Sequence, residues 1–155
     1  MIRNSKRNEL LQNYLQEMQS IKELPPYSKE ELDQSCLVYF EDTNSEWVDV
    51  FSEDGKIIGF IIIGYTPNCH PDADFYIEEA YIQPEYRRKK YMFRAVTKFL
   101  KYNGGTYCLF IVNRNTPALN FWHYVFKENG YLPVELTNIV PLEPYLKQYG
   151  FGREK

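Results

Sequence analysis

The sequence predicts an α/β domain built on a mixed sheet, because two kinds of periodicity alternate along the chain. Segments with apolar residues at helical spacing are separated by short β-branched runs that are typical of strands. The expected order is helix, helix, hairpin, strand, helix, strand, helix, strand. A length of 155 residues suits one compact domain, so we expect a single domain over residues 1–155.

Two helices are expected at the start of the chain. Over residues 8–21, apolar residues recur at helical spacing and form one stripe with a charged back. Ser28, followed three residues later by Glu31, is a capping-box pattern. It predicts a second, short helix that runs to about Cys36.

Strand patterns dominate the middle of the chain. Residues 47–51 and 56–65 flank an Asp-Gly turn and predict an antiparallel hairpin. A polar loop is expected over 66–74, and a third strand over 75–83. The apolar run at 106–112 does not alternate, which is typical of a strand at the centre of a sheet.

Two further helices and a last strand are expected in the second half. One helix is predicted over 91–102, and another from Asn115, whose side chain can cap it, to about Glu128. The last strand is predicted over 131–140. The pattern assigns nothing after Pro141.

Composition argues against several functional classes. A net charge of -3 disfavours a general nucleic-acid binder and suits basic small molecules or basic peptides as partners. The longest apolar run, residues 57–63, is far shorter than a membrane span of about 20 residues. The first residues lack the apolar core of a signal peptide, so we expect a cytoplasmic protein without membrane attachment. Cys36, Cys69 and Cys108 are odd in number and lack CxxC spacing, which predicts reduced thiols.

A basic turn joins the strand at 75–83 to the helix that starts at Tyr91. Such a turn presents backbone N–H groups and the positive end of a helix dipole, which suit a pyrophosphate, although an isolated RRKK run is more often a solvated turn. The phrase YIEEAYIQPEYRRKKYMFRAVTKFL resembles motif A of the GCN5-related N-acetyltransferases, whose Arg-x-x-Gly-x-Gly/Ala turn holds the pyrophosphate of CoA. Arg87 matches the family's arginine. Lys90 and Met92 stand where the family usually has glycines, which permit the closest approach to phosphate.

A second phrase, RNTPALNFWHYVFKENGY, resembles motif B of the same family. Asn115, Ala118 and Phe121 match the motif, which in the family lies beside the pantetheine and the thioester. Trp122 replaces the tyrosine that often protonates the leaving thiolate, and an indole N–H cannot act as an acid. The gap from this position to Gly130 is about three residues longer than is usual in the family, so we expect Tyr124 or water to take that role, and Trp122 is interpreted as a core residue.

The resemblance is strongest over residues 45–135 and implies a mostly antiparallel central sheet flanked by helices. It implies acetyl-CoA as co-substrate. The residues that it places along this cofactor are Ile82, Arg87, Arg88, Lys89, Lys90, Tyr91, Met92, Asn115, Ala118 and Phe121.

Glu78 and Glu79 are the candidates for a general base. They are adjacent on an expected strand and would point to opposite faces of a regular sheet. The phrase IEEAYIQP resembles that of the family's polyamine acetyltransferases, whose first acid is associated with deprotonating the amine and corresponds to Glu78. The alternative is one solvated and one salt-bridged glutamate.

No metal site is expected. Cys69, His70, Asp72 and Asp74 fall within six residues, and the sequence offers no second cluster, so a polar substrate loop is the favoured interpretation. His123 is interpreted as a packed or surface histidine.

The resemblance implies an N-acetyltransferase that acts on a primary amine of a small molecule or a basic peptide, with a homodimer left open. The alternative is a non-catalytic module of the same fold that binds acyl-CoA or a partner protein. The replaced glycines and Trp122 favour that alternative.

Overall fold

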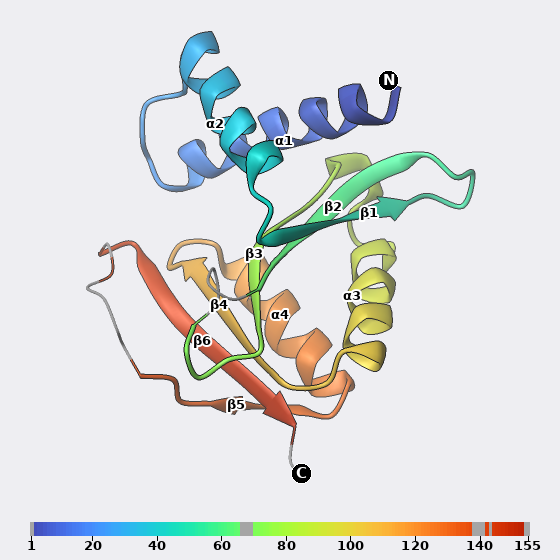
Figure 1. The fold of residues 1–155 in the computed structure, drawn as a ribbon, viewed down its shortest axis with the longest axis vertical. Helices are drawn as coiled ribbons and strands as arrows, with labels where there is room; N and C mark the ends of the chain where they lie inside the picture. Colours follow the sequence, from blue (N-terminus) through green and yellow to red (C-terminus); the bar gives the residue numbers. More distant parts are fainter. Residues whose placement is uncertain (1, 66–69, 138–141, 143, 154–155) are drawn as a thin grey trace.

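The computed structural model describes residues 2–65, 70–137, 142 and 144–153. Its helices are α1 (Ile2–Ile21), α2 (Lys29–Glu41), α3 (Tyr91–Tyr102) and α4 (Thr116–Glu128), with a 3-10 turn η1 (Pro84–Tyr86) before α3. Its strands are β1 (Ser45–Phe51), β2 (Ile57–Gly64), β3 (Phe75–Ile82), β4 (Thr106–Val112), β5 (Tyr131–Val134) and β6 (Leu146–Arg153). Figure 1 shows how they are arranged.

The strands of the described part of the chain form one mixed sheet in the order β1-β2-β3-β4-β6-β5. Neighbouring strands are antiparallel except β3 and β4, which are parallel. Parallel neighbours need a crossover connection, and α3 supplies it. The predicted α/β class, with a mixed and mostly antiparallel sheet, is therefore confirmed.

The C-terminal part of the sheet differs from the sequence prediction. Strand β5 ends at Val134, and part of the predicted extension to residue 140 lies outside the described residues. Strand β6 was not predicted, because Gly150 and Gly152 lower its strand propensity. A Cβ on Gly150 would lie 2.7 Å from the Val134 carbonyl oxygen, so the close approach of β5 requires glycine here.

The N-terminal helices are longer than predicted. Helix α1 begins at Ile2 rather than at residue 8, and α2 continues beyond Cys36 to Glu41. The predicted capping box at the start of α2 is confirmed, since the Ser28 hydroxyl accepts from the Glu31 N–H and the Glu31 carboxylate accepts from the Ser28 N–H, each at 3.1 Å.

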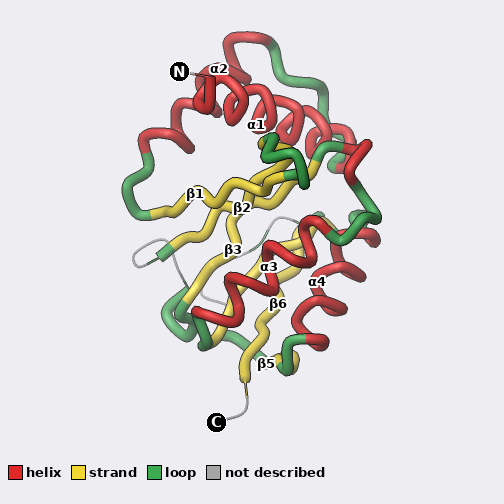
Figure 2. Tube along the Cα trace, turned by 90° about the vertical axis from the view of Figure 1, so that its right-hand side faces the viewer, coloured by secondary structure: helices red, strands yellow, loops and turns green. Residues whose placement is uncertain are grey.

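Each face of the sheet carries its own pair of helices (Figure 2). One core lies between the sheet and the α1–α2 pair and contains Leu10, Leu11, Leu15, Leu32, Cys36, Phe60, Ile62 and Tyr81. The larger core lies against α3 and α4, and its members include Ile58, Ile61, Ile63, Ile77, Val96, Leu100, Leu109, Trp122 and Phe126. Both faces of the sheet therefore carry helices, and the α1–α2 pair packs on the part formed by β1, β2 and β3.

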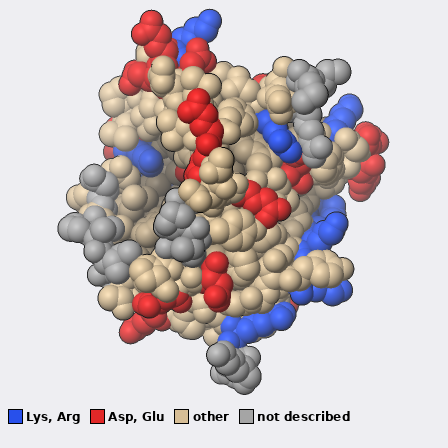
Figure 3. Space-filling model, in the orientation of Figure 1, with Lys and Arg blue, Asp and Glu red and all other residues tan. Residues whose placement is uncertain are grey.

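Charged side chains of both signs occur on the face shown in Figure 3, and several acidic ones lie near its middle. None of the described helices is both long enough and apolar enough to cross a membrane.

Cys36 and Cys108 are buried thiols, and burial raises the pKa of Cys36 to about 11. Cys69 lies outside the described residues.

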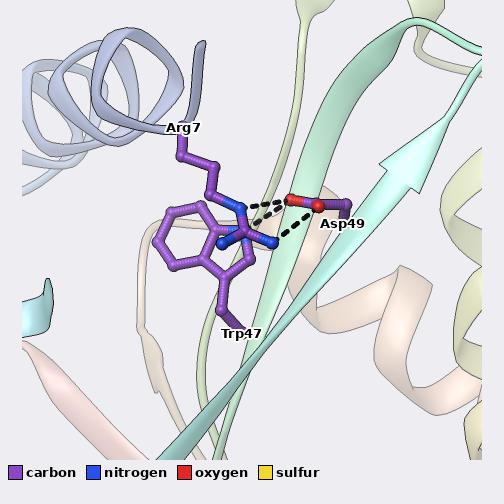
Figure 4. Close-up of polar contacts among 3 residues, drawn as sticks. All are labelled: Arg7, Trp47 and Asp49. Atoms are coloured by element: carbon purple, nitrogen blue, oxygen red, sulfur yellow. Dashed lines mark hydrogen bonds and ion pairs between the residues drawn. The ribbon is translucent and has the colours of Figure 1, made fainter. Parts of the chain in front are cut away.

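An ion pair fastens α1 to the edge of the sheet (Figure 4). Arg7 donates from Nε and Nη2 to the two carboxylate oxygens of Asp49 in β1, at 2.8 and 2.7 Å. The Trp47 indole N–H donates to the same carboxylate at 2.8 Å. The Asp49 side chain is only 1% exposed, so this bidentate contact compensates a buried charge and holds α1 over the sheet.

Candidate active site

Strands β3 and β4 lie side by side at one end only. They pair over three residues, ending at Ile77 and Leu109. On its other edge, β3 carries an irregularity in its pairing with β2, and Glu78 is the extra residue. Such a bulge bends a strand, and beyond it β3 and β4 diverge.

Two adjoining cavities occupy the space where the strands diverge. The wider one has a volume of about 750 Å³ and extends from the turn before α3, along β3, to α4. The narrower one, about 70 Å³, lies between β3 and β4. The residues common to both walls are Tyr14, Met18, Ala80, Asn115, Ala118 and Trp122. We call the two cavities together the groove.

The basic turn forms the outer end of the groove. Lys90 is the N-cap of α3 and has a left-handed backbone, with φ at 64°, and Arg88 has φ at 62°. Lys90 thus takes the conformation for which glycine is usually selected, so the backbone path of the turn does not depend on a glycine. The first helical hydrogen bond of α3 is made by the Arg94 N–H, which leaves the preceding amides of the first turn without a helical acceptor. Such amides suit a pyrophosphate.

Arg87 is held by neighbours rather than pointing freely into the groove. Its Nη2 donates to the Glu17 carboxylate of α1 at 2.8 Å, and its Nε donates to the Ile82 carbonyl at 3.0 Å. Its guanidinium also lies over the Tyr81 ring, 5.5 Å from the centroid. Helix α1 therefore neutralises the arginine that the resemblance assigns to pyrophosphate.

Helix α4 forms the opposite wall. The Asn115 side chain caps the helix by accepting from the Ala118 N–H at 3.3 Å, which confirms the predicted cap. Trp122 is 6% exposed and belongs to the larger core, as interpreted, yet it also lines both cavities. Tyr124 is 48% exposed, packs against the Phe93 ring and lines only the wider cavity.

Both carboxylates of the Glu78–Glu79 pair line the inner end of the groove. The expectation that they point to opposite faces is wrong, because the bulge inserts Glu78 as an extra residue in the strand. Both side chains face α1 and α2. Glu79 contacts Tyr14 and Tyr39 of these helices, and Glu78 contacts Ser45 at the start of β1.

The two carboxylates have different partners. Glu78 accepts from the Ser45 hydroxyl at 2.9 Å, and burial raises the pKa of Glu78 against the opposing effect of this bond. Glu79 accepts from the hydroxyls of Tyr14 and Tyr39, the latter at 2.6 Å. Burial also raises the pKa of Glu79, and the two tyrosines only partly offset it. Both groups are therefore easier to protonate than ordinary glutamates.

The polar loop before β3 makes structural contacts. His70 Nδ1 accepts from the Asp72 N–H at 2.9 Å, so Nε2 carries the proton and donates to the Thr137 carbonyl at 2.5 Å. The Asp74 carboxylate accepts from the Thr106 N–H at 2.8 Å.

Within the described residues, no three His, Cys, Asp or Glu side chains are placed to hold a metal ion. His123 packs edge-on against the Tyr149 and Phe151 rings, consistent with a packed histidine.

The groove gathers most of the residues that the resemblance suggested. Every residue predicted along the cofactor lines the wider cavity except Lys89, which is exposed. The contribution of α1 to the site was not predicted from the sequence. Tyr14, Glu17, Met18 and Ile21 of α1 also line the wider cavity. The apolar stripe of α1 was visible in the sequence, but nothing local indicated which surface it covers.

One protein-family model matches most of the chain. The family model described as "Acetyltransferase (GNAT) family" matches residues 8–125. A search of curated proteins finds no match.

Several solved structures share the fold. One is an acetyltransferase from Thermus thermophilus, with a TM-score of 0.65 and 14% identity over 94% of this chain and 90% of that chain. Another is spermidine N-acetyltransferase from Vibrio cholerae in complex with CoA and spermine, with a TM-score of 0.59 and 16% identity over 93% and 87%. Tetrahymena GCN5 has a TM-score of 0.60 and 14% identity over 97% and 88%.

Proposed function

Because the chain belongs to the acetyltransferase (GNAT) family, we propose that it is an N-acetyltransferase that moves an acetyl group from acetyl-CoA to a primary amine of a small molecule or peptide. The observation that carries this proposal is the course of the groove. It begins at a basic helix N-terminus and ends at two partly buried carboxylates, Glu78 and Glu79. These are the two chemical requirements of the reaction, an anion site and a base.

The groove has the size and chemistry for the cofactor. A volume of about 750 Å³ lies within the usual range of ligand sites. The amides at the start of α3, with Arg88 and Lys90, would hold the pyrophosphate. Pantetheine would extend along Ala80 of β3 and past Asn115 of α4, which places the thioester at the narrow end.

The reaction then needs a base and an oxyanion site at the narrow end. A neutral amine attacks the thioester carbonyl, and Glu78 removes the proton that the amine nitrogen must lose. Backbone N–H groups of β3 would stabilise the oxyanion. The pKa of Glu78 is raised toward neutral pH. A general base is most effective when its pKa lies near the pH at which the enzyme works.

A cationic acceptor fits the inner end best. Glu78 and Glu79 are adjacent there, and Asp42 lies near enough to raise the pKa of Glu78. A solved protein of similar fold was crystallised with CoA and spermine. A di- or polyamine is therefore the acceptor class that we propose to test first.

The alternative is a non-catalytic module that binds acyl-CoA or a partner protein. It is favoured by Trp122 at the usual tyrosine position and by the pairing of Arg87 with Glu17. Both features weaken individual catalytic elements but leave the groove open.

Release of free thiol from acetyl-CoA distinguishes the two functions. The protein should be assayed with spermidine, an amino sugar and a lysine peptide, while CoA binding is measured separately by calorimetry. Thiol release that depends on an amine supports the enzyme. CoA binding with no thiol release from any amine would support the non-catalytic module, and no CoA binding would reject both acyl-CoA functions.

A further inference from the structure

Tyr14 lies where the groove narrows. Of the residues common to both cavity walls, Tyr14 is the one with a titratable side chain. Its ring is held edge-on against Phe60 and Tyr81, with centroids 5.8 and 5.9 Å away. The phenol is therefore held at the point where the wide and narrow cavities meet.

The Tyr14 hydroxyl is connected to a carboxyl group. It donates to Glu79 Oε2, while Glu79 Oε1 accepts from Tyr39 at 2.6 Å. Tyr39 comes from α2 and lines neither cavity, so the two tyrosines share one carboxylate but differ in their access to the groove. When Glu79 is protonated, its own O–H can donate to the Tyr14 oxygen, which frees the Tyr14 proton to point into the groove.

We propose that Tyr14 is the acid that protonates the departing CoA thiolate, and that Glu79 resupplies its proton. This inference rests on the proposed acetyl transfer. Trp122 of α4 also lines both cavities but cannot release a proton, and Tyr124 lines only the wider cavity. Helix α4 supplies no acid at the narrow end, and Tyr14 of α1 takes this role.

Each proton that moves in this step has a donor and an acceptor. As the carbon–sulfur bond breaks, sulfur takes the electron pair and receives the Tyr14 proton, while the Glu79 carboxyl proton passes to the Tyr14 oxygen. Glu79 is left as a carboxylate. It regains a proton through solvent from neighbouring Glu78, which has taken one from the amine nitrogen. The net result is one proton moved from nitrogen to sulfur.

The surroundings of Glu79 allow both of its protonation states. Burial and Glu78 favour its neutral form, whereas Lys22, which directly follows α1, favours the charged form. Burial also raises the pKa of Tyr14, so the phenol keeps its proton. Because a phenol is a weaker acid than a thiol, its proton can reach sulfur efficiently only if Glu79 replaces it in the same step.

The first test needs no amine. CoA is bound to the protein, and ionisation of its thiol is followed by the ultraviolet absorbance of the thiolate. Tyr14→Phe should lower the ionisation constant of the bound thiol by roughly tenfold, the scale of a lost charge-assisted hydrogen bond. Tyr39→Phe is the matched control, because it removes the same group from the same carboxylate outside the groove, and it should change the constant far less.

The second test uses turnover of an amine that the wild type acetylates. Tyr14→Phe and Glu79→Gln should each lower kcat by about 10²-fold or more with little change in CoA affinity, whereas Tyr39→Phe should lose only a few-fold. Phenylalanine preserves the ring contacts of Tyr14, and a melting curve checks that the variant is folded.

The outcomes separate this proposal from the proposed function. If wild-type protein acetylates an amine but Tyr14→Phe keeps both the thiol ionisation and kcat, then Tyr14 is not the acid and the acetyltransferase proposal stands. Equal losses in Tyr14→Phe and Tyr39→Phe would show that the two hydroxyls only position Glu79. That result would overturn the proposed proton transfer from Glu79 through Tyr14 to sulfur. A wild-type protein that does not bind CoA would overturn both.

Discussion

The guanidinium of Arg87 donates to the Glu17 carboxylate across 2.8 Å, so the arginine of the basic turn is bound to helix α1. The contact joins residues 70 positions apart. It places a carboxylate beside the expected pyrophosphate site, where a bound phosphate group would compete with Glu17 for Arg87.

Removing the Glu17 charge should therefore tighten CoA binding. We expect Glu17→Gln to do so by up to about fivefold, because an ion pair with both side chains 37% exposed contributes at most about 1 kcal/mol. Calorimetric titration with CoA measures the change. Glu9→Gln, on the same helix but outside the groove, is the control, and weaker binding in Glu17→Gln would show that Glu17 holds Arg87 in its binding position.

A glycine at position 90 should stabilise the protein in the absence of ligand. Lys90 has φ at 64°, a left-handed conformation that costs a residue with a Cβ about 1 kcal/mol and costs glycine almost nothing. Urea unfolding should therefore give a higher midpoint for Lys90→Gly. Lys89→Gly provides the matched control, because Lys89 is not among the positive-φ residues and should lose stability instead. A destabilised Lys90→Gly would contradict the strain argument.

Breaking the contact between α1 and β1 should be costly. Arg7→Ala leaves the nearly buried Asp49 charge without its bidentate partner, although the Trp47 N–H remains. We expect a loss of about 2–3 kcal/mol in the free energy of unfolding, somewhat below the cost of breaking a fully buried pair. Lys6→Ala removes only the more exposed pair with Glu9 and should change the free energy by less than about 0.5 kcal/mol. Similar losses in both variants would exclude a special role for Asp49.

The stability of the protein should carry a pH dependence that originates at Glu79. Its pKa is raised in the folded state above the ordinary value of 4.5, mainly by burial. The contribution is therefore fully present below about pH 4.5 and is lost as pH rises through the folded pKa. Glu79→Gln should gain stability relative to wild type as pH increases over that range. A difference that does not vary with pH would mean that Glu79 titrates normally.

Glu78 should act on the amine and not on the cofactor. Glu78→Gln is expected to lower turnover by about 10²–10⁴-fold while CoA binding stays nearly unchanged. The rate should recover partly at higher pH, where more of the amine is already neutral. Glu46→Gln on β1, an exposed glutamate that lines neither cavity, is the control. Wild-type turnover in Glu78→Gln would remove Glu78 from the mechanism.

Local sequence signals predicted those structural elements of the groove that are each formed by one continuous segment of the chain. The Asn115 cap and the central apolar run over 106–112 both appear in the structure as predicted. The basic turn also lies directly before α3, as predicted. Caps, turns and apolar periodicity act over a few residues, so their consequences can be recognised from the sequence itself.

Tertiary structure alone decided how the inner end of the groove is built. The bulge at Glu78 depends on register with β2, and it sets both carboxylates toward α1 and α2. Glu79 meets Tyr14 and Tyr39 across 65 and 40 positions of sequence. Strand β6, rich in glycine, is fixed by pairing with β4 and β5 on either side. These features arise from packing between distant segments, and no local pattern encodes which distant surface a helix or strand will meet.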